Sequence, residues 1–541
     1  MFKKFAFAAS LAAASALSTP AHAEWKVAET EHFIYYSEAP EAELRETVEN
    51  LEKFDTLVRA LTNNSRPANP VKVTMFEVAT MDDVNATFPY PSRGVGGYYS
   101  STLDGPFLVT FRDNLRTGRK SALRANTQSY AWGPEVRQHE YLHHYMYQYF
   151  NTNYPSWYSE GFAEYYGTMA FLEDNVVEIG HAPFFRLNAI RGGSWIDAED
   201  LLSAKSYADV DDVSALYAQG WLLTHFAANN PERGKQLQEY LNAVASGTDY
   251  GEAAKAAFGD LDKLNKELKD HRNNINAVRL SLKPMDFSDI EVRDLTPVDD
   301  SLMRYRIALY SGLEYSEIPL ILNAVKERRA ADPNDVAGLE IQAQLENMAG
   351  MHDDALATTA RLLELDPGNI EGLTERGKAL VGNLETGAAQ AEWDAAREPL
   401  REAIAASNVA IEPRVALFTS FEKQGQMPSV TAQNRLVEAF QLLPQNDEIR
   451  YLLARDFEQR GFIEDAISII EPAAFGTFDG DDAEKRRRER ALRRYSERYS
   501  NINNYESPKD MLDRLVAKRD GNWDEENNTF INPPQPEDEE A

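Results

Sequence analysis

The run HEYLH, residues 139 to 143, constrains this chain most, because its two histidines can act together only if the segment is helical. Spaced four residues apart on a helix, His139 and His143 lie one turn apart on the same face. Two imidazoles in this arrangement can bind one zinc ion. Glu140 follows the first histidine and would point toward a metal-bound water, which is the placement of a general base. The run therefore predicts a helix that carries a zinc site.

A third ligand is expected from the next segment, WYSEGFAEYYG, residues 157 to 167. Its apolar and aromatic residues predict a second helix, and Glu160 lies near its start. A carboxylate can complete a catalytic zinc site that has two histidines. Glu164 lies one turn after Glu160 on the same face, and we expect it to accept the free N–H of a ligating imidazole. The alternative is an ordinary helix with two surface histidines and no metal.

Two further histidines, one beside the HEYLH run and one much later in the chain, are not expected to bind the metal. His144 points off the face shared by His139 and His143, and we expect it to be hydrogen-bonded or solvated. His225 could donate a hydrogen bond to a transition state, but a buried structural role is the preferred interpretation.

Length and composition exclude several classes of protein. A chain of 541 residues exceeds what one hydrophobic core organises, so two or three domains are expected. The formal charge of -31 argues against nucleic acid or an anionic membrane surface as a partner. The chain has no cysteine, which excludes disulfides, thiolate metal sites and a cysteine nucleophile.

Residues 1–23 read as a cleavable signal peptide. Two lysines are followed by an apolar run and by the small-x-small site Ala21-His22-Ala23, so the mature protein is expected to begin at Glu24. No later stretch has the length of a transmembrane helix. We therefore expect a periplasmic or secreted protein without a transmembrane segment after signal removal.

Residues 24–275 have a mixed pattern that predicts an α+β domain. Alternating apolar residues predict a small, mostly antiparallel sheet, and later segments with helical spacing predict a helical subdomain. Strands are expected at residues 25–38, 71–79, 94–101 and 106–113. Helices are expected at residues 41–62, 135–150, 157–171, 213–229, 232–245 and 260–275.

The second half of the chain is predicted to be an all-α solenoid. Residues 276–300 contain two prolines among polar residues and are expected to be a linker. Residues 301–475 read as helical hairpins, in which Pro333 and Pro367 are separated by the 34-residue period of tetratricopeptide repeats. Gly350 fits the turn of one such unit, and an insertion is expected near residues 382–392.

The C-terminal residues have a biased composition. Residues 476–506 contain the basic run EKRRRERALRR and are expected to form a charged helical cap. The alternative for this run is a docking site for an acidic partner. Residues 507–541 end in PPQPEDEE and are expected to be an acidic, largely disordered tail.

The segments HEYLH and SEGFAEYY resemble those of the gluzincin metallopeptidases, most closely the MA-like peptidase domains of bacterial exported proteins with tetratricopeptide repeats. SEGFAEYY is similar to the N-E-G-F-A segment of aminopeptidase N relatives. The resemblance covers about residues 25–275 and implies a thermolysin-like zincin fold with Zn²⁺ held by His139, His143 and Glu160.

Two other segments bear on this resemblance. YAQG, residues 217 to 220, is similar to a helix whose tyrosine stabilises the oxyanion, which implies that role for Tyr217; the alternative is a core aromatic. The G-x-M-E-N strand of the aminopeptidases, whose glutamate holds the substrate amine, corresponds here to GVGGYY, which has no acid. This departure argues against aminopeptidase activity and leaves a strand edge open to an extended peptide.

The sequence thus predicts an exported zinc metallopeptidase in which Glu140 is the general base. The substrate is a peptide or protein, and the repeats bind the substrate or a protein partner. The alternative is a periplasmic tetratricopeptide scaffold whose zinc domain is structural or catalytically silent. Glu140 argues against the alternative, because a structural zinc site needs no general base.

Overall fold

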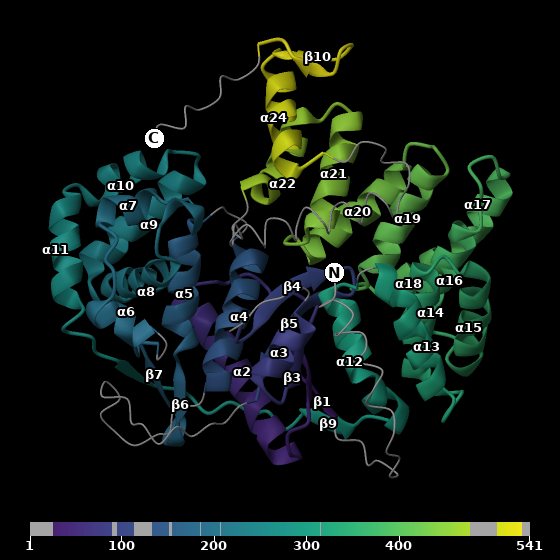
Figure 1. The fold of residues 1–541 in the computed structure, drawn as a ribbon, viewed down its shortest axis with the longest axis horizontal. Coiled ribbons are helices and arrows are strands. Elements are labelled where there is room, and N and C mark those ends of the chain that lie inside the picture. Colours follow the sequence, from purple (N-terminus) through teal and green to yellow (C-terminus); the bar gives the residue numbers. More distant parts are fainter. Residues whose placement is uncertain are drawn as a thin grey trace.

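The fold is a mixed α/β structure with a large helical region and small sheets (Figure 1). This computed structural model describes residues 25–88, 95–112, 132–150, 154–183, 186–205, 207–313, 315–475 and 506–532. The predicted signal peptide and nearly all of the predicted helical cap lie outside the described residues. Among the described residues, no helix is long and apolar enough to cross a membrane.

The larger sheet has six strands in the order β4-β5-β3-β2-β1-β9. Three of its five strand pairings are antiparallel, which agrees with the predicted mostly antiparallel sheet. The exception is β3, which runs parallel to both β2 and β5. Helix α2 forms the crossover between the parallel strands β2 and β3. The elements are β1 (Lys26–Glu29), β2 (Phe33–Ser37), α2 (Glu41–Leu61), β3 (Val73–Val78), α3 (Met81–Thr87), β4 (Tyr98–Thr102), β5 (Gly105–Phe111) and β9 (Glu291–Asp294).

The segment predicted as a linker, residues 276–300, belongs to the sheets. β8 (Val278–Ser281) pairs with β7 (Val176–Ile179), and β9 pairs with β1. The three strands β6 (Ala170–Leu172), β7 and β8 form a smaller sheet. Because β8 and β9 are mostly exposed, they lack the apolar alternation from which strands are predicted.

A helical subdomain follows the first five strands and lies to the left of the six-stranded sheet in Figure 1. The predicted helices are present, although α5 ends earlier than expected, before β6. The prediction missed α10 and the short helices α6 and α7. The bounds are α4 (Trp132–Tyr149), α5 (Ser156–Gly167), α6 (Leu187–Gly192), α7 (Ala198–Ser203), α8 (Val213–Asn229), α9 (Pro231–Ala245), α10 (Tyr250–Phe258) and α11 (Leu261–His271).

The sheet and the helical subdomain share one hydrophobic core. It extends from Phe33 in β2 through Leu142 in α4 and Trp157 in α5 to Trp221 in α8 and Leu264 in α11, and each of these side chains is fully buried. The helices α4, α5 and α8 are therefore packed into the centre of the domain.

Helical hairpins follow, as predicted, and curve over the right side of the sheet in Figure 1. Gly350 occupies the expected turn with φ 72°. The expected insertion, residues 382–392, covers the connection between α16 and the short helix α17 and the first residues of α17. The helices are α12 (Pro297–Ser311), α13 (Ile318–Arg329), α14 (Val336–Met348), α15 (His352–Leu365), α16 (Ile370–Gly382), α17 (Gln390–Ala396), α18 (Glu398–Ala406), α19 (Glu412–Lys423), α20 (Val430–Leu442), α21 (Asp447–Gln459) and α22 (Ile463–Phe475).

The predicted disorder of residues 507–541 is wrong for the described part of that segment. α24 (Pro508–Arg519) packs against α22, and a short hairpin of β10 (Trp523–Asp524) and β11 (Thr529–Phe530) follows it. Met511 and Leu515 of α24 are buried in the core of the last repeats. The prediction rested on the acidic run PPQPEDEE at the end of the segment, whereas α24 itself has four basic and two acidic residues.

Candidate metal centre

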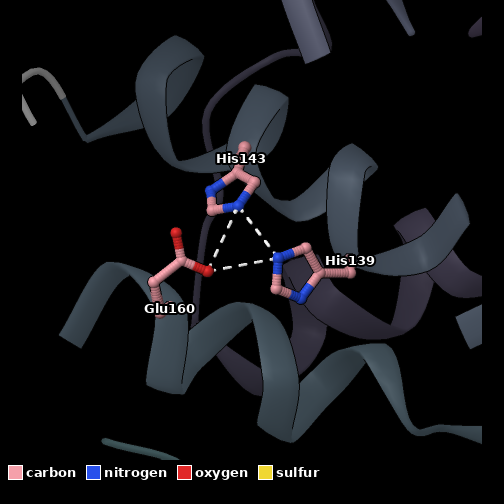
Figure 2. Close-up of side chains that lie close together, drawn as sticks. All are labelled: His139, His143 and Glu160. Atoms are coloured by element: carbon pink, nitrogen blue, oxygen red, sulfur yellow. Dashed lines mark hydrogen bonds and ion pairs between the residues drawn. The ribbon is translucent and has the colours of Figure 1, made fainter. Parts of the chain in front are cut away.

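His139, His143 and Glu160 converge on one point between α4 and α5 (Figure 2). The two Nε2 atoms lie 3.1 Å apart, and Glu160 Oε2 lies 3.2 Å from His139 Nε2 and 3.6 Å from His143 Nε2. Bonds of about 2.0–2.1 Å from tetrahedral zinc place neighbouring ligand atoms about 3.3 Å apart. Two imidazole nitrogens and a carboxylate oxygen at these separations fit a zinc ion. The His139 side chain remains 18% exposed, which leaves a route to the site.

The first two ligands are oriented by close packing between α4 and α5. A Cβ atom on Gly167 would lie 3.3 Å from His139 N, so the end of α5 passes directly beside the first ligand. Gln138, the residue before that ligand, has its amide placed to donate to Gly167 O at 2.6 Å and Met169 O at 3.1 Å. These contacts hold the two helices in register.

A buried ionic network attaches α4 to the six-stranded sheet. Arg137 donates to Tyr35 Oη and to Glu77 Oε1, each at 2.6 Å, and Ser37 donates to Glu77 Oε2 at 2.6 Å. All four side chains are buried. Because breaking a buried pair leaves an uncompensated charge, this network fixes the first turns of α4 on β2 and β3.

The third ligand is positioned by backbone contact between α5 and α8. A Cβ atom on Gly161 would lie 2.4 Å from Gly220 C, and one on Gly220 would lie 2.2 Å from Trp157 O. Glycine is therefore required at both positions. Gly161 follows Glu160 and Gly220 is three residues after Tyr217, so this crossing brings Tyr217 near the glutamate ligand.

Tyr207, which the sequence prediction missed, contacts the glutamate ligand directly. Its hydroxyl donates to Glu160 Oε1, the carboxylate oxygen that does not face the histidines. The Tyr217 hydroxyl lies 3.5 Å from that of Tyr207, and the two rings stack with centroids 5.9 Å apart. Tyr207 lies in a short turn before α8, and no pattern in the sequence singles it out.

Glu164 does not take the predicted role. Its Oε1 accepts from Arg186 Nε at 2.8 Å, and among the described residues no hydrogen bond joins it to a histidine ligand. The guanidinium of Arg186 lies 4.3 Å from the centre of the Tyr217 ring. Glu164 therefore pairs with Arg186, and through Arg186 it is linked to Tyr217.

His144 and Glu140 lie one turn apart on α4, beside the face that carries His139 and His143. His144 is buried with its Nδ1 3.3 Å from Tyr99 Oη and is not part of the convergent group, as predicted. Burial lowers the pKa of His144 to about 3, so it is neutral. Glu140 is half-buried, and its Cγ lies 3.0 Å from the place that a Cβ on Gly97 would occupy.

Burial and mutual charge set the ionisation of the three converging residues. Burial raises the pKa of Glu160, but His143 and His139 outweigh it and lower the pKa to about 2. Burial also lowers the pKa of His143 to about 4, which keeps that imidazole neutral and able to ligate. For His139, burial lowers the pKa, but Glu160 outweighs it and raises the value to about 9. His139 must therefore lose a proton when it binds a metal.

Two other clusters of titratable side chains lie outside the convergent group: the pair His225 and His271, and a set of three carboxylates. His225 Nδ1 lies 2.8 Å from His271 Nε2, and His225 Nε2 lies 3.2 Å from Asn276 O, so it has the structural role preferred from the sequence. A second convergent group joins Asp104, Glu371 and Glu412, where the β4–β5 turn meets α16 and α19. It is a contact between the sheet and the repeats.

Comparison with known proteins adds little to this picture. No protein-family model matches the chain, and no curated protein matches it. Among solved structures, a thermophilic TPR protein of Thermus thermophilus is similar at 18% identity and a TM-score of 0.30. The match covers 36% of this chain and 98% of that one. At this TM-score the similarity carries no argument, and the assignment of the site depends on its own residues.

Proposed function

We propose that this protein is a zinc-dependent metallopeptidase with a thermolysin-like catalytic domain. The observation that carries the proposal is the triangle of His139 Nε2, His143 Nε2 and Glu160 Oε2, with sides of 3.1 to 3.6 Å. Glu140 adjoins this triangle on the same helix. Two histidines and a carboxylate form the donor set of catalytic zinc sites that keep one position open for water, and the neighbouring glutamate can act as the base.

Glu140 is the proposed general base and acid. Bound at the triangle, zinc supplies Lewis acidity to a water molecule and to the carbonyl of the peptide bond. The Glu140 carboxylate accepts the proton of the attacking water and later donates it to the leaving amine. The net reaction adds one water across the peptide bond and leaves Glu140 ionised.

Two tyrosines complete the proposed mechanism. Tyr207 donates to Glu160 Oε1 and so directs Oε2 toward the histidines. Tyr217 is the proposed donor to the oxyanion that forms as water attacks, a contribution on the order of 3 kcal/mol. Its position beside Tyr207 and Arg186 supports that role.

The outer strand β4 is the proposed site of peptide binding. It ends the order of the six-stranded sheet, and the residues before it pass beside Glu140. An extended peptide can hydrogen-bond to such an edge as an additional strand. A peptide bound there would run beside the proposed base.

The test is zinc analysis together with cleavage of an unstructured protein such as casein. We expect one zinc ion per chain in wild type and in Glu140→Gln, with cleavage lost only in the latter. Glu239→Gln, an exposed change on α9, is the matched control and should behave as wild type. Absence of stoichiometric zinc, or equal cleavage by wild type and Glu140→Gln, would overturn the proposal.

A further inference from the structure

A loop of the repeat region lies on the outer strand of the sheet. The last residue of α20, Leu442, and residues 443–446, which connect α20 to α21, form the 442–446 loop, and two of its side chains reach β4. Asn446 Nδ2 donates to Ser101 O at 3.3 Å, and Gln445 Nε2 donates to Tyr99 Oη at 3.1 Å. The repeats therefore contact the strand that passes the proposed catalytic site.

This loop is held firmly in place. Asn69 Nδ2 donates to Leu442 O at 2.7 Å, which ties the loop to the segment before β3. Leu103, in the β4–β5 turn, is buried in the same hydrophobic cluster as Leu443 of the loop. The side-chain oxygen of Asn446 caps α21 by accepting from Ile449 N at 3.0 Å.

The pairing of β4 with β5 shows which backbone groups face outward. Thr102 and Gly105 close the two-residue hairpin turn, so Ser101 lies in the next, non-hydrogen-bonded pair, opposite Pro106, which has no N–H. The backbone groups of Ser101 and, two residues earlier, Tyr99 therefore point to the outer edge. Asn446 occupies this edge at Ser101.

The other end of the same strand lies at the proposed catalytic site. A Cβ atom on Gly97 would lie 2.6 Å from Val136 Cγ1 and 3.0 Å from Glu140 Cγ, so the chain passes against the proposed base. The Tyr99 ring stacks on Tyr147, which in turn stacks on the ligand His143. From Gly97 to Ser101 an extended chain covers about 13 Å.

We infer that the 442–446 loop ends the peptide-binding edge of β4 at Ser101. A substrate paired with this edge then extends by only about four residues in that direction from the cleaved bond. The substrate class is therefore an extended chain end, from which the enzyme releases short peptides. This inference rests on the proposed function and assigns the repeats a part in substrate selection.

The test varies peptide length on either side of one cleaved bond. Fluorescent peptides share a casein-derived sequence that wild type cleaves and are lengthened with Gly-Ser residues on one side or the other. Cleavage is measured as kcat/KM of the wild type, and binding is measured by anisotropy with the inactive Glu140→Gln protein. Asn446→Asp keeps the cap of α21 but loses the donor to Ser101 O. Asn230→Asp, at the cap of α9, is the matched control.

We expect both binding and kcat/KM to fall at least about tenfold when one side exceeds about four residues, whereas lengthening the other side has no effect. In Asn446→Asp, binding and kcat/KM should depend less on peptide length, whereas Asn230→Asp should show the same length dependence as wild type. Cleavage that depends on Glu140 but is equal at all lengths, or an unchanged profile in Asn446→Asp, overturns the inference alone. Absence of Glu140-dependent cleavage at every length overturns the proposed function and the inference with it.

Discussion

At the scale of single residues, the two carboxylate oxygens of Glu160 have different partners. Oε2 faces the two imidazoles, and Oε1 accepts from Tyr207. A hydrogen bond to the second oxygen of a ligating carboxylate fixes which oxygen faces the metal. The second tyrosine, Tyr217, touches the first but makes no hydrogen bond to Glu160 among the described contacts. The two tyrosines should therefore have separable effects.

Phenylalanine substitutions should separate metal binding from catalysis. Tyr207→Phe is expected to weaken zinc binding by about 10- to 100-fold, because Glu160 loses the partner that orients it. Tyr217→Phe is expected to lower kcat by about 100-fold at unchanged zinc content, because the oxyanion donor is removed. Chelator competition measures the affinity, and zinc-saturated peptidase assays measure kcat. Equal zinc affinity in Tyr207→Phe and wild type would contradict the role given to that hydroxyl.

At the scale of the elements, the site depends on three helices that cross with little space between them. Gly161 and Gly220 allow backbone contact between α5 and α8, and Gly167 allows α5 to approach His139. The network of Arg137 and Glu77 attaches α4 to the sheet. Ligands from separate helices stay within about half an ångström of their working geometry only when such packing is tight.

Gly220→Ala should reduce both stability and zinc binding. A Cβ atom there would meet Trp157 O at 2.2 Å, so α5 and α8 must separate, at a cost of about 1–3 kcal/mol or more. Gly192→Ala, with open space around the added atom, is the control and should change stability by less than about 0.5 kcal/mol. Urea denaturation measures the free energy of unfolding. Equal stability of the two variants would show that the crossing tolerates a side chain.

At the scale of the whole molecule, the repeats and the sheet meet through hydrogen bonds, apolar packing and a group of carboxylates. Asp104 comes from the β4–β5 turn, Glu371 from α16 and Glu412 from α19. Lys378 donates to Glu412 at 2.6 Å and also contacts Glu375. Lys378 thus pairs with two of the carboxylates gathered here, Glu412 and Glu375.

This contact should weaken as the pH rises. Burial raises the pKa of Glu371 well above its usual value, and the charges of Glu412, Glu375 and Asp104 raise it further, against the attraction of Lys378. The stabilisation is therefore complete below the unfolded-state pKa of about 4.3 and is lost as the pH rises through the folded-state pKa. Each unit by which the folded-state pKa exceeds the unfolded-state pKa corresponds to about 1.4 kcal/mol of folding free energy.

Melting temperatures measured between about pH 5 and 8 test this prediction. Wild type should lose stability toward the higher pH, and Glu371→Gln should lose less, because its amide cannot ionise. Glu398→Gln, an exposed change on α18, should follow wild type. Parallel curves for wild type and Glu371→Gln would show that this carboxyl does not govern the contact.

His139 and His143 could be predicted as neighbours from the sequence, because residues four apart lie one turn apart on any helix. Glu160 was proposed from the segment SEGFAEYY, and it lies one turn into α5. The helical hairpins were likewise predictable from the spacing of Pro333 and Pro367. Local rules of this kind do not depend on how the elements pack together.

Only the tertiary structure could supply the remaining contacts, because they join segments that no local pattern relates. Tyr207 donates to Glu160 from a short turn 47 residues away. Arg186 donates to the Glu164 carboxylate, which was expected to accept from a histidine. β8 and β9 join the sheets without apolar alternation. Asn446 meets Ser101 across 345 residues of sequence. Side-chain partners at such separations follow from packing, whereas the proximity of His139 and His143 follows from their spacing on one helix.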